Sequence, residues 1–141
     1  MNRPATFTEL PHDPAMQAAG IAILLWASEP EAPHRLVTPF FHAAAAAAMD
    51  TPVEIYFTAR SVQLLVPGVA AQLRASPHHD KTVYDALQEA VGHGARLLAC
   101  TDALHAQGVD PQHLIPECRE RGGAVQFMAR AADLRWRTLV Y

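Results

Sequence analysis

Hydrophobic residues in this chain fall into short continuous runs that alternate with segments of helical spacing. In a strand covered by helices on both faces, neighbouring positions are all apolar, so a short continuous apolar run predicts a buried strand. Five segments are apolar over most of their length and are predicted as strands: residues 20–27, 53–58, 95–99, 124–128 and 138–141. Because helical segments separate them, the pattern predicts a mostly parallel sheet with helices on both sides, an α/β fold.

Helical spacing is clearest at residues 34–49 and 82–91. The first of these segments contains Pro39, which predicts either a helix that starts there with Thr38 as its N-cap or a kinked helix. Its run of six alanines would let the helix approach a sheet or another subunit closely. Shorter helical pieces are expected at residues 60–73 with a break at Pro67-Gly68, and at 101–109, 111–121 and 129–134.

Length and local composition bound the domain organisation. The 141 residues are enough for one domain with its own core. Residues 1–19 contain three prolines and no long periodic pattern, so we expect an N-terminal arm there and a single domain over residues 20–141. In open parallel sheets, functional sites lie at the carboxyl ends of strands. This rule directs attention to the loops after Trp26, Thr58 and Cys100.

The charge pattern excludes some classes of partner. The formal net charge is −3, and the single lysine and ten arginines are scattered along the chain. Binding to phosphates requires grouped basic side chains, so nucleic acid is not an expected partner. The apolar run at residues 21–27 is too short to cross a bilayer, and no membrane association is expected. Two cysteines are too few for a disulfide framework, so we expect a reduced, cytoplasmic protein.

Cys100 is the strongest candidate for chemistry. It follows a predicted strand and precedes a predicted helix that a glycine closes. A thiol beside a helix N-terminus is favoured as the thiolate, the form that attacks sulfur. The Asp102 carboxylate acts against this, and His105 lies too far round the helix to serve as a base, so a Cys-His-Asp protease is not indicated. The alternative is a buried cysteine that packs as a small hydrophobic residue.

Trp26, Ser28, Thr58 and Arg60 follow the first two predicted strands and are expected to line a pocket near Cys100. The aromatic residues at these strand ends, Trp26, Tyr56 and Phe57, would wall that pocket or belong to the core. Cys118 is predicted as a half-buried helix residue; a resolving role would require its sulfur to lie near Cys100.

Neither a metal nor a cofactor is expected. His78-His79-Asp80 resembles a fragment of a metal site, but the paired spacing across two elements that zinc sites show is missing. Gly92-His93-Gly94 precedes a strand and not a helix, so it does not fit a dinucleotide-binding loop.

The pattern Cys100-x-x-Ala103-x-x-x-x-Gly108-Val109 resembles the DsrE/DsrF/TusD/YchN-like (DsrE-like) sulfur-relay family. The resemblance covers residues 20–141 and includes the opening apolar strand, the aromatic segment before Leu64-Leu65 and the late Gly122-Gly123-Ala124 segment. The chain departs from the family at Asp102, where a small or apolar residue is usual, and at Arg60, where an acidic or small residue is common.

The resemblance implies a flavodoxin-like three-layer α/β/α sandwich, homo-oligomers (trimers or hexamers) and a cysteine that accepts sulfur as a persulfide. It therefore suggests a sulfur carrier or sulfurtransferase that exchanges sulfur with donor and acceptor proteins or thiols. Cys100 would hold the sulfur, with support from Thr101, Asp102 and Ala103. The alternatives are a non-catalytic oligomeric small-ligand-binding or scaffold protein on the same fold, and a metal-binding module built on the histidines.

Overall fold

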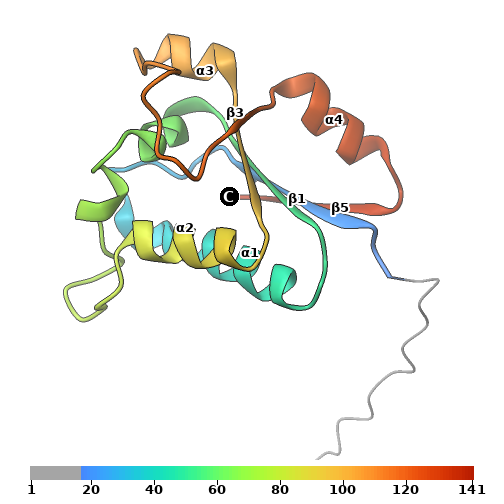
Figure 1. The fold of residues 1–141 in the computed structure, drawn as a ribbon, viewed down its shortest axis with the longest axis horizontal. Helices are drawn as coiled ribbons and strands as arrows, with labels where there is room; N and C mark the ends of the chain where they lie inside the picture. The colour runs from blue at the N-terminus through green and yellow to red at the C-terminus, as the bar shows by residue number, and fades with distance from the viewer. Residues whose placement is uncertain (1–16) are drawn as a thin grey trace, which may run out of the picture.

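The protein forms one parallel sheet with helices on both faces (Figure 1). The computed structural model describes residues 17–141, so most of the predicted N-terminal arm lies outside the described residues. The strands are β1 (Gly20–Leu25), β2 (Val53–Phe57), β3 (Arg96–Ala99), β4 (Glu120–Arg121) and β5 (Trp136–Val140). The α/β class and the parallel five-stranded sheet are confirmed.

The strand order is β4-β3-β2-β1-β5, with every neighbouring pair parallel. The chain therefore builds outward from β1 to β4 and then returns to place β5 on the other side of β1. Because crossovers between parallel strands are right-handed, this reversal puts the last helix on the opposite face of the sheet from the earlier ones. That helix, α4 (Ala124–Ala132), lies apart from α1 and α2 in Figure 1.

The larger part of the core lies between the sheet and the helices α1 (Val37–Ala48) and α2 (Val83–Gly92). Phe40 of α1 packs against Phe57 of β2, with 6.2 Å between the ring centroids. The alanine run of α1 is largely buried, and this helix packs against α2 of the same chain. The small side chains thus serve a close contact within the subunit.

Two predicted elements are wrong. Residues 124–128, predicted as a strand, form the first half of α4, and the helical turn predicted at residues 129–134 is its continuation. Ala124, Phe127 and Met128 have the i, i+3, i+4 spacing of a helix face, and alanines with high helix propensity follow them. The apolar run alone does not distinguish the two structures.

The helix predicted at residues 111–121 is also absent from the described structure; the segment is a series of turns that leads into β4. Pro116 cannot donate a helical hydrogen bond. The backbone N–H of Ile115 instead donates to the carbonyl of Leu65, 2.9 Å away, which ties the segment to η3 (Ala59–Leu65). The chain is then extended at Glu120, where it pairs with β3.

The starts of the long helices depend on local chemistry. Thr82 is the N-cap of α2, and its hydroxyl and the Asp85 carboxylate each accept a backbone N–H of the other residue, a capping box. In α1, Thr38 is not the N-cap, because the helix begins at Val37 after a short turn, η2 (Pro33–Arg35). Pro39 lies in the first turn of α1, where its missing N–H has no helical partner to lose.

Candidate functional site at the carboxyl edge of the sheet

Cys100 lies at the junction between β3 and α3 (Thr101–Ala106), where it is the N-cap residue. Its backbone is fixed on both sides: its N–H donates to the carbonyl of Phe57 at 3.0 Å, and its carbonyl accepts from Leu104 at 3.0 Å. The side chain makes no capping hydrogen bond within residues 17–141 and is half-buried. The thiol is therefore held in place by its backbone while the sulfur itself remains available.

The thiol opens into a pocket of about 310 Å³ on the α4 face of the sheet. The ends of β1 and β2 form one side of it, and the loop after β4 and the start of α4 form the other. The lining residues are Leu24, Trp26, Tyr56, Phe57, Thr58, Cys100, Gly122, Gly123, Ala124, Phe127 and Met128. Pieces of chain that are distant in sequence thus meet around one sulfur atom.

Two glycines bring the chain close to Cys100. A Cβ atom added at Gly122 would lie 2.9 Å from Cδ2 of Leu98, so the loop passes over β3 where a side chain would clash. A Cβ atom at Gly123 would lie 3.8 Å from Sγ of Cys100, which is contact distance. The backbone at Gly123 therefore forms the part of the pocket wall that lies beside the Cys100 sulfur.

A buried carboxylate holds the far wall of the pocket in position. Glu54 of β2 is 1% exposed and accepts hydrogen bonds from Arg130 of α4 at 2.6 and 3.1 Å. Arg96 donates to the same carboxylate at 3.2 Å, and the Tyr56 hydroxyl donates to it at 3.0 Å. The ring of Phe127 meets that of Tyr56 edge-on, with the centroids 5.4 Å apart. One ionic and one aromatic contact thus attach α4 to the sheet.

This network was not predicted from the sequence. The sequence feature that points to this network is the one acidic residue inside the otherwise apolar strand at residues 53–57. A buried carboxylate requires partners that compensate its charge. Desolvation by burial, followed by the Glu54 carboxylate, raises the pKa of Tyr56 to about 12. Tyr56 therefore contributes a neutral ring to the pocket, and its hydroxyl is engaged by Glu54.

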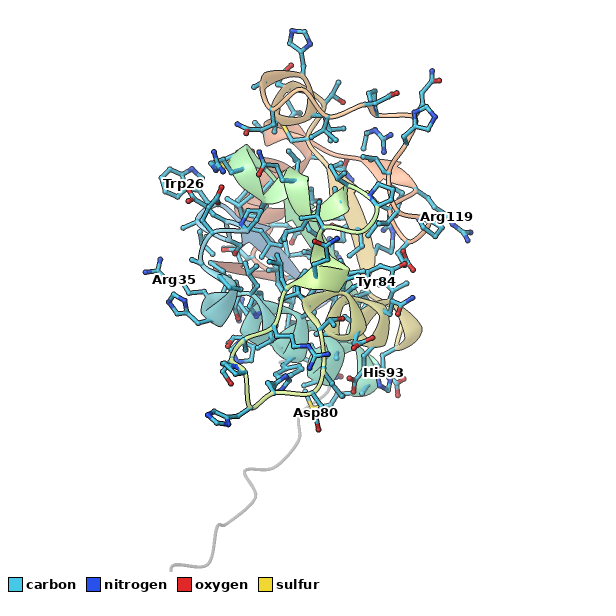
Figure 2. The ribbon with its side chains drawn as sticks, turned by 90° about the vertical axis from the view of Figure 1, so that its left-hand side faces the viewer. Trp26, Arg35, Asp80, Tyr84, His93 and Arg119 are labelled. Carbon is cyan, nitrogen blue, oxygen red and sulfur yellow. The ribbon has the colours of Figure 1, made fainter. Side chains whose placement is uncertain are left out.

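The four residues predicted to line the pocket separate into two pairs. Thr58 and Trp26 do line it, and Trp26 is 63% exposed, with its ring at the molecular surface (Figure 2). Ser28 is buried and Arg60 forms an ion pair with Glu31; neither is among the lining residues.

The three residues that follow Cys100 also differ in their surroundings. Thr101 and Asp102 are exposed in the first turn of α3, whereas Ala103 is buried in the core. Thr101 lines a separate hollow with Leu104 and His105. Their backbone N–H groups lie at the helix start, where helical geometry leaves such groups without an intrahelical acceptor.

Cys118 differs from Cys100 in its burial and in its access to the pocket. It is buried in the turns before β4, and not on a helix as predicted, and it is not among the residues around the Cys100 pocket. Its Sγ lies 3.7 Å from the carbonyl oxygen of Leu97 and 3.8 Å from that of Glu120. Burial raises the pKa of the Cys118 thiol. Cys118 is therefore a packed, protonated side chain.

Within residues 17–141, no group of three or more His, Cys, Asp or Glu side chains is arranged to hold a metal ion. In the same part of the chain, no helix is long and apolar enough to cross a membrane.

The fold and the site define a parallel α/β protein with a cysteine in a pocket at the carboxyl edge of its sheet. The chain belongs to the DsrE/DsrF-like family, whose sequence model matches residues 20–133. Two solved structures share the fold at 17% sequence identity. The YchN protein from E. coli has a TM-score of 0.65, with 89% of this chain and 100% of that chain covered. MTH1491 from Methanobacterium thermoautotrophicum, a protein of unknown function, has a TM-score of 0.59 and coverages of 86% and 97%. A comparison with curated proteins gave no match.

Proposed function

We propose that this protein is a sulfur carrier that holds sulfur as a persulfide on Cys100. The observation that supports it most is the contrast between the two cysteines: Cys100 opens into a pocket, whereas Cys118 is buried among backbone carbonyl groups. Membership of the DsrE/DsrF-like family supports a role in sulfur relay. A carrier with free thiols works in a reducing compartment, and we place it in the cytoplasm.

The proposed reaction is thiol–persulfide exchange. The Cys100 thiolate attacks the outer sulfur of a donor R–S–SH, so that a new S–S bond forms on Cys100 while the donor S–S bond breaks. The donor leaves as R–S⁻ and takes up a proton, and Cys100 carries –S–SH. An acceptor thiolate then attacks the same outer sulfur and regenerates the Cys100 thiolate. The two steps together move one sulfur atom without net oxidation or reduction.

The surroundings of Cys100 suit a transient anionic sulfur. The backbone N–H groups at Thr101–Ala103 are available as donors at the start of α3, because the Cys100 side chain does not cap them. The exposed carboxylate of Asp102 opposes this, but water screens it. We assign the supporting role to the backbone of this turn.

We also propose that the protein self-associates. Large apolar side chains are exposed on and around α4 and β5: Val125, Met128, Leu134, Leu139 and Val140. Contiguous exposed apolar surface marks interaction sites in soluble proteins. The family resemblance implies trimers or hexamers. Sedimentation of the full chain at micromolar concentration measures this, and a monomer there would contradict the proposal.

Mass spectrometry after incubation with a persulfide donor tests the carrier function. We expect wild type and Cys118→Ala to gain one sulfur atom and Cys100→Ser to gain none. A gain of sulfur that persists in Cys100→Ser would refute the assignment.

The apolar lining of the pocket favours one alternative, a non-catalytic small-ligand-binding or scaffold protein on the same fold. In that case Cys100 would not react with iodoacetamide in the native protein.

A further inference from the structure

The lining of the Cys100 pocket carries information about what reaches the thiol. Among the described residues around it, none has a charged side chain. Three contribute aromatic rings: Trp26, Tyr56 and Phe127. The ring of Phe57 packs against Phe40 on the other face of the sheet. The hydroxyl of Tyr56 already donates to Glu54, so this residue offers a ligand mainly its ring. The remaining side-chain polar groups are the indole N–H of Trp26, the Thr58 hydroxyl and the Cys100 thiol itself.

Arginine side chains near the Cys100 pocket already form ion pairs with carboxylates of the protein. Arg130 and Arg96 both donate to Glu54, and Arg130 also lies over the ring of Trp136, 4.0 Å from its centroid. Arg60, at the same edge of the sheet, forms an ion pair with Glu31. An anionic ligand in the pocket would therefore have to compete with carboxylates of the protein for a counter-charge.

The size of the pocket sets a second limit. Its volume, about 310 Å³, is near the lower end of the range for small-molecule sites, roughly 300–1,000 Å³. A single ring or a short alkyl chain fits that space. A peptide thiol with two carboxylates and an ammonium group would bring unpaired charges against apolar walls, which is costly.

We propose that the Cys100 pocket selects small uncharged sulfur compounds, with an aromatic or alkyl group beside the reactive sulfur, over charged low-molecular-weight thiols and persulfides. This inference rests on the proposed function, because it names the class of donor that the sulfur carrier accepts. The ring or alkyl group lies in the pocket against Phe127 and Met128. Its persulfide sulfur then exchanges with Cys100 in the balanced step given above.

The first test compares two disulfides that report on the same thiol. In the Cys118→Ala background, Cys100–S⁻ attacks either neutral 4,4′-dithiodipyridine or anionic 5,5′-dithiobis(2-nitrobenzoate), forming a mixed disulfide and releasing one aryl thiolate. The rate constant of each reagent with the protein is divided by its rate constant with N-acetylcysteine amide, an uncharged thiol. High salt screens the net charge of the protein. We expect the normalised rate to be at least about tenfold higher for the neutral reagent.

A pair of charge variants separates the pocket from the surface around it. Met128 lines the pocket and is 58% exposed, whereas Ala129, the next residue on α4, does not line it and is also exposed. Met128→Lys places a cation beside the pocket and should remove most of the preference for the neutral reagent. Ala129→Lys adds the same charge to the same helix and should leave it unchanged. Equal normalised rates in the parent protein, or equal effects of the two variants, would overturn the proposal.

A second readout does not need a reactive thiol. Calorimetric titration of Cys100→Ala with 4-(methylthio)benzamide and with 4-(methylthio)benzoate should show at least about tenfold tighter binding of the neutral amide. If Cys100 accepts sulfur but neither experiment shows a preference, the selectivity is wrong and the carrier function stands. If the amide is preferred but Cys100 accepts sulfur from no donor, the carrier function is wrong and the pocket chemistry stands.

Discussion

Arg130 of α4 and Glu54 of β2 form an ion pair with two hydrogen bonds on the face of the sheet that α4 covers, with donor–acceptor distances of 2.6 and 3.1 Å. Every residue of α4 is at least partly exposed, so apolar burial alone attaches this helix weakly. The ion pair and the ring contact between Phe127 and Tyr56 supply the remainder. The helix that walls the pocket thus depends on one charged side chain.

Arg130→Met is expected to destabilise the protein by about 2–3 kcal/mol, because removing one partner of a buried ion pair leaves its carboxylate undercompensated. Arg96 still donates to Glu54, which keeps the loss at the lower end of the range for buried pairs. Urea denaturation measures the change. Arg35→Met, at an exposed position, is the control and should have little effect. Equal losses in the two variants would contradict the role of the ion pair.

Alkaline pH should weaken the fold through Tyr56. Its pKa is raised from 10.0 in the unfolded chain to about 12 in the folded one, so the folded state keeps a proton that the unfolded state loses. This contribution is fully present below pH 10 and is lost as the pH rises toward 12.

Denaturation midpoints measured between these two pH values test the prediction. Tyr56→Phe should reduce the decline without abolishing it, because the pKa values of Tyr84 and Tyr141 are also raised. An unchanged alkaline decline in Tyr56→Phe would show that Tyr56 does not contribute.

Side chains added at Gly123 should shield Cys100 in proportion to their size. The backbone there is extended, with φ −108°, so it accepts any residue, and a Cβ would lie 3.8 Å from the sulfur. Gly123→Ala should slow alkylation by iodoacetamide slightly, and Gly123→Val by about tenfold, with unfolding free energies changed by less than about 1.5 kcal/mol. Equal alkylation rates in all three proteins would place the wall elsewhere.

Thr82→Ala should cost about 1 kcal/mol, because it removes the capping box of α2. Thr38→Ala is the matched control: Thr38 precedes a proline in the way that a cap would, yet it lies inside the first turn of α1 and is exposed. Thermal denaturation of both variants distinguishes the true cap from the apparent one. A larger loss for Thr38→Ala would reverse the assignment.

Local sequence signals were sufficient for the first part of the fold. The strands β1, β2 and β3 are mostly apolar, and α2 has both a cap and an amphipathic face. The position of Cys100 between a strand and a helix was also predicted from these signals. Each of these features depends on residues that are neighbours in the sequence.

The later part of the fold depends on contacts that are distant in sequence. The apolar run at the start of α4 is compatible with a strand or a helix, and its helical form places Arg130 against Glu54, 76 positions earlier. The turns before β4 are tied to η3 by Ile115 and Leu65. Periodicity carries no information about such pairs, so the far wall of the pocket could not be predicted.

The order of the strands has a consequence for the newly made chain. Because β5 is added on the other side of β1 after β4, the far wall of the pocket is synthesised after strands β1 to β4. Domains fold while synthesis proceeds from the N-terminus, at roughly 5–20 residues per second. Until α4 and β5 emerge from the ribosome, the nascent protein has Cys100 without that wall, so solutes reach the thiol with less steric restriction than in the folded molecule.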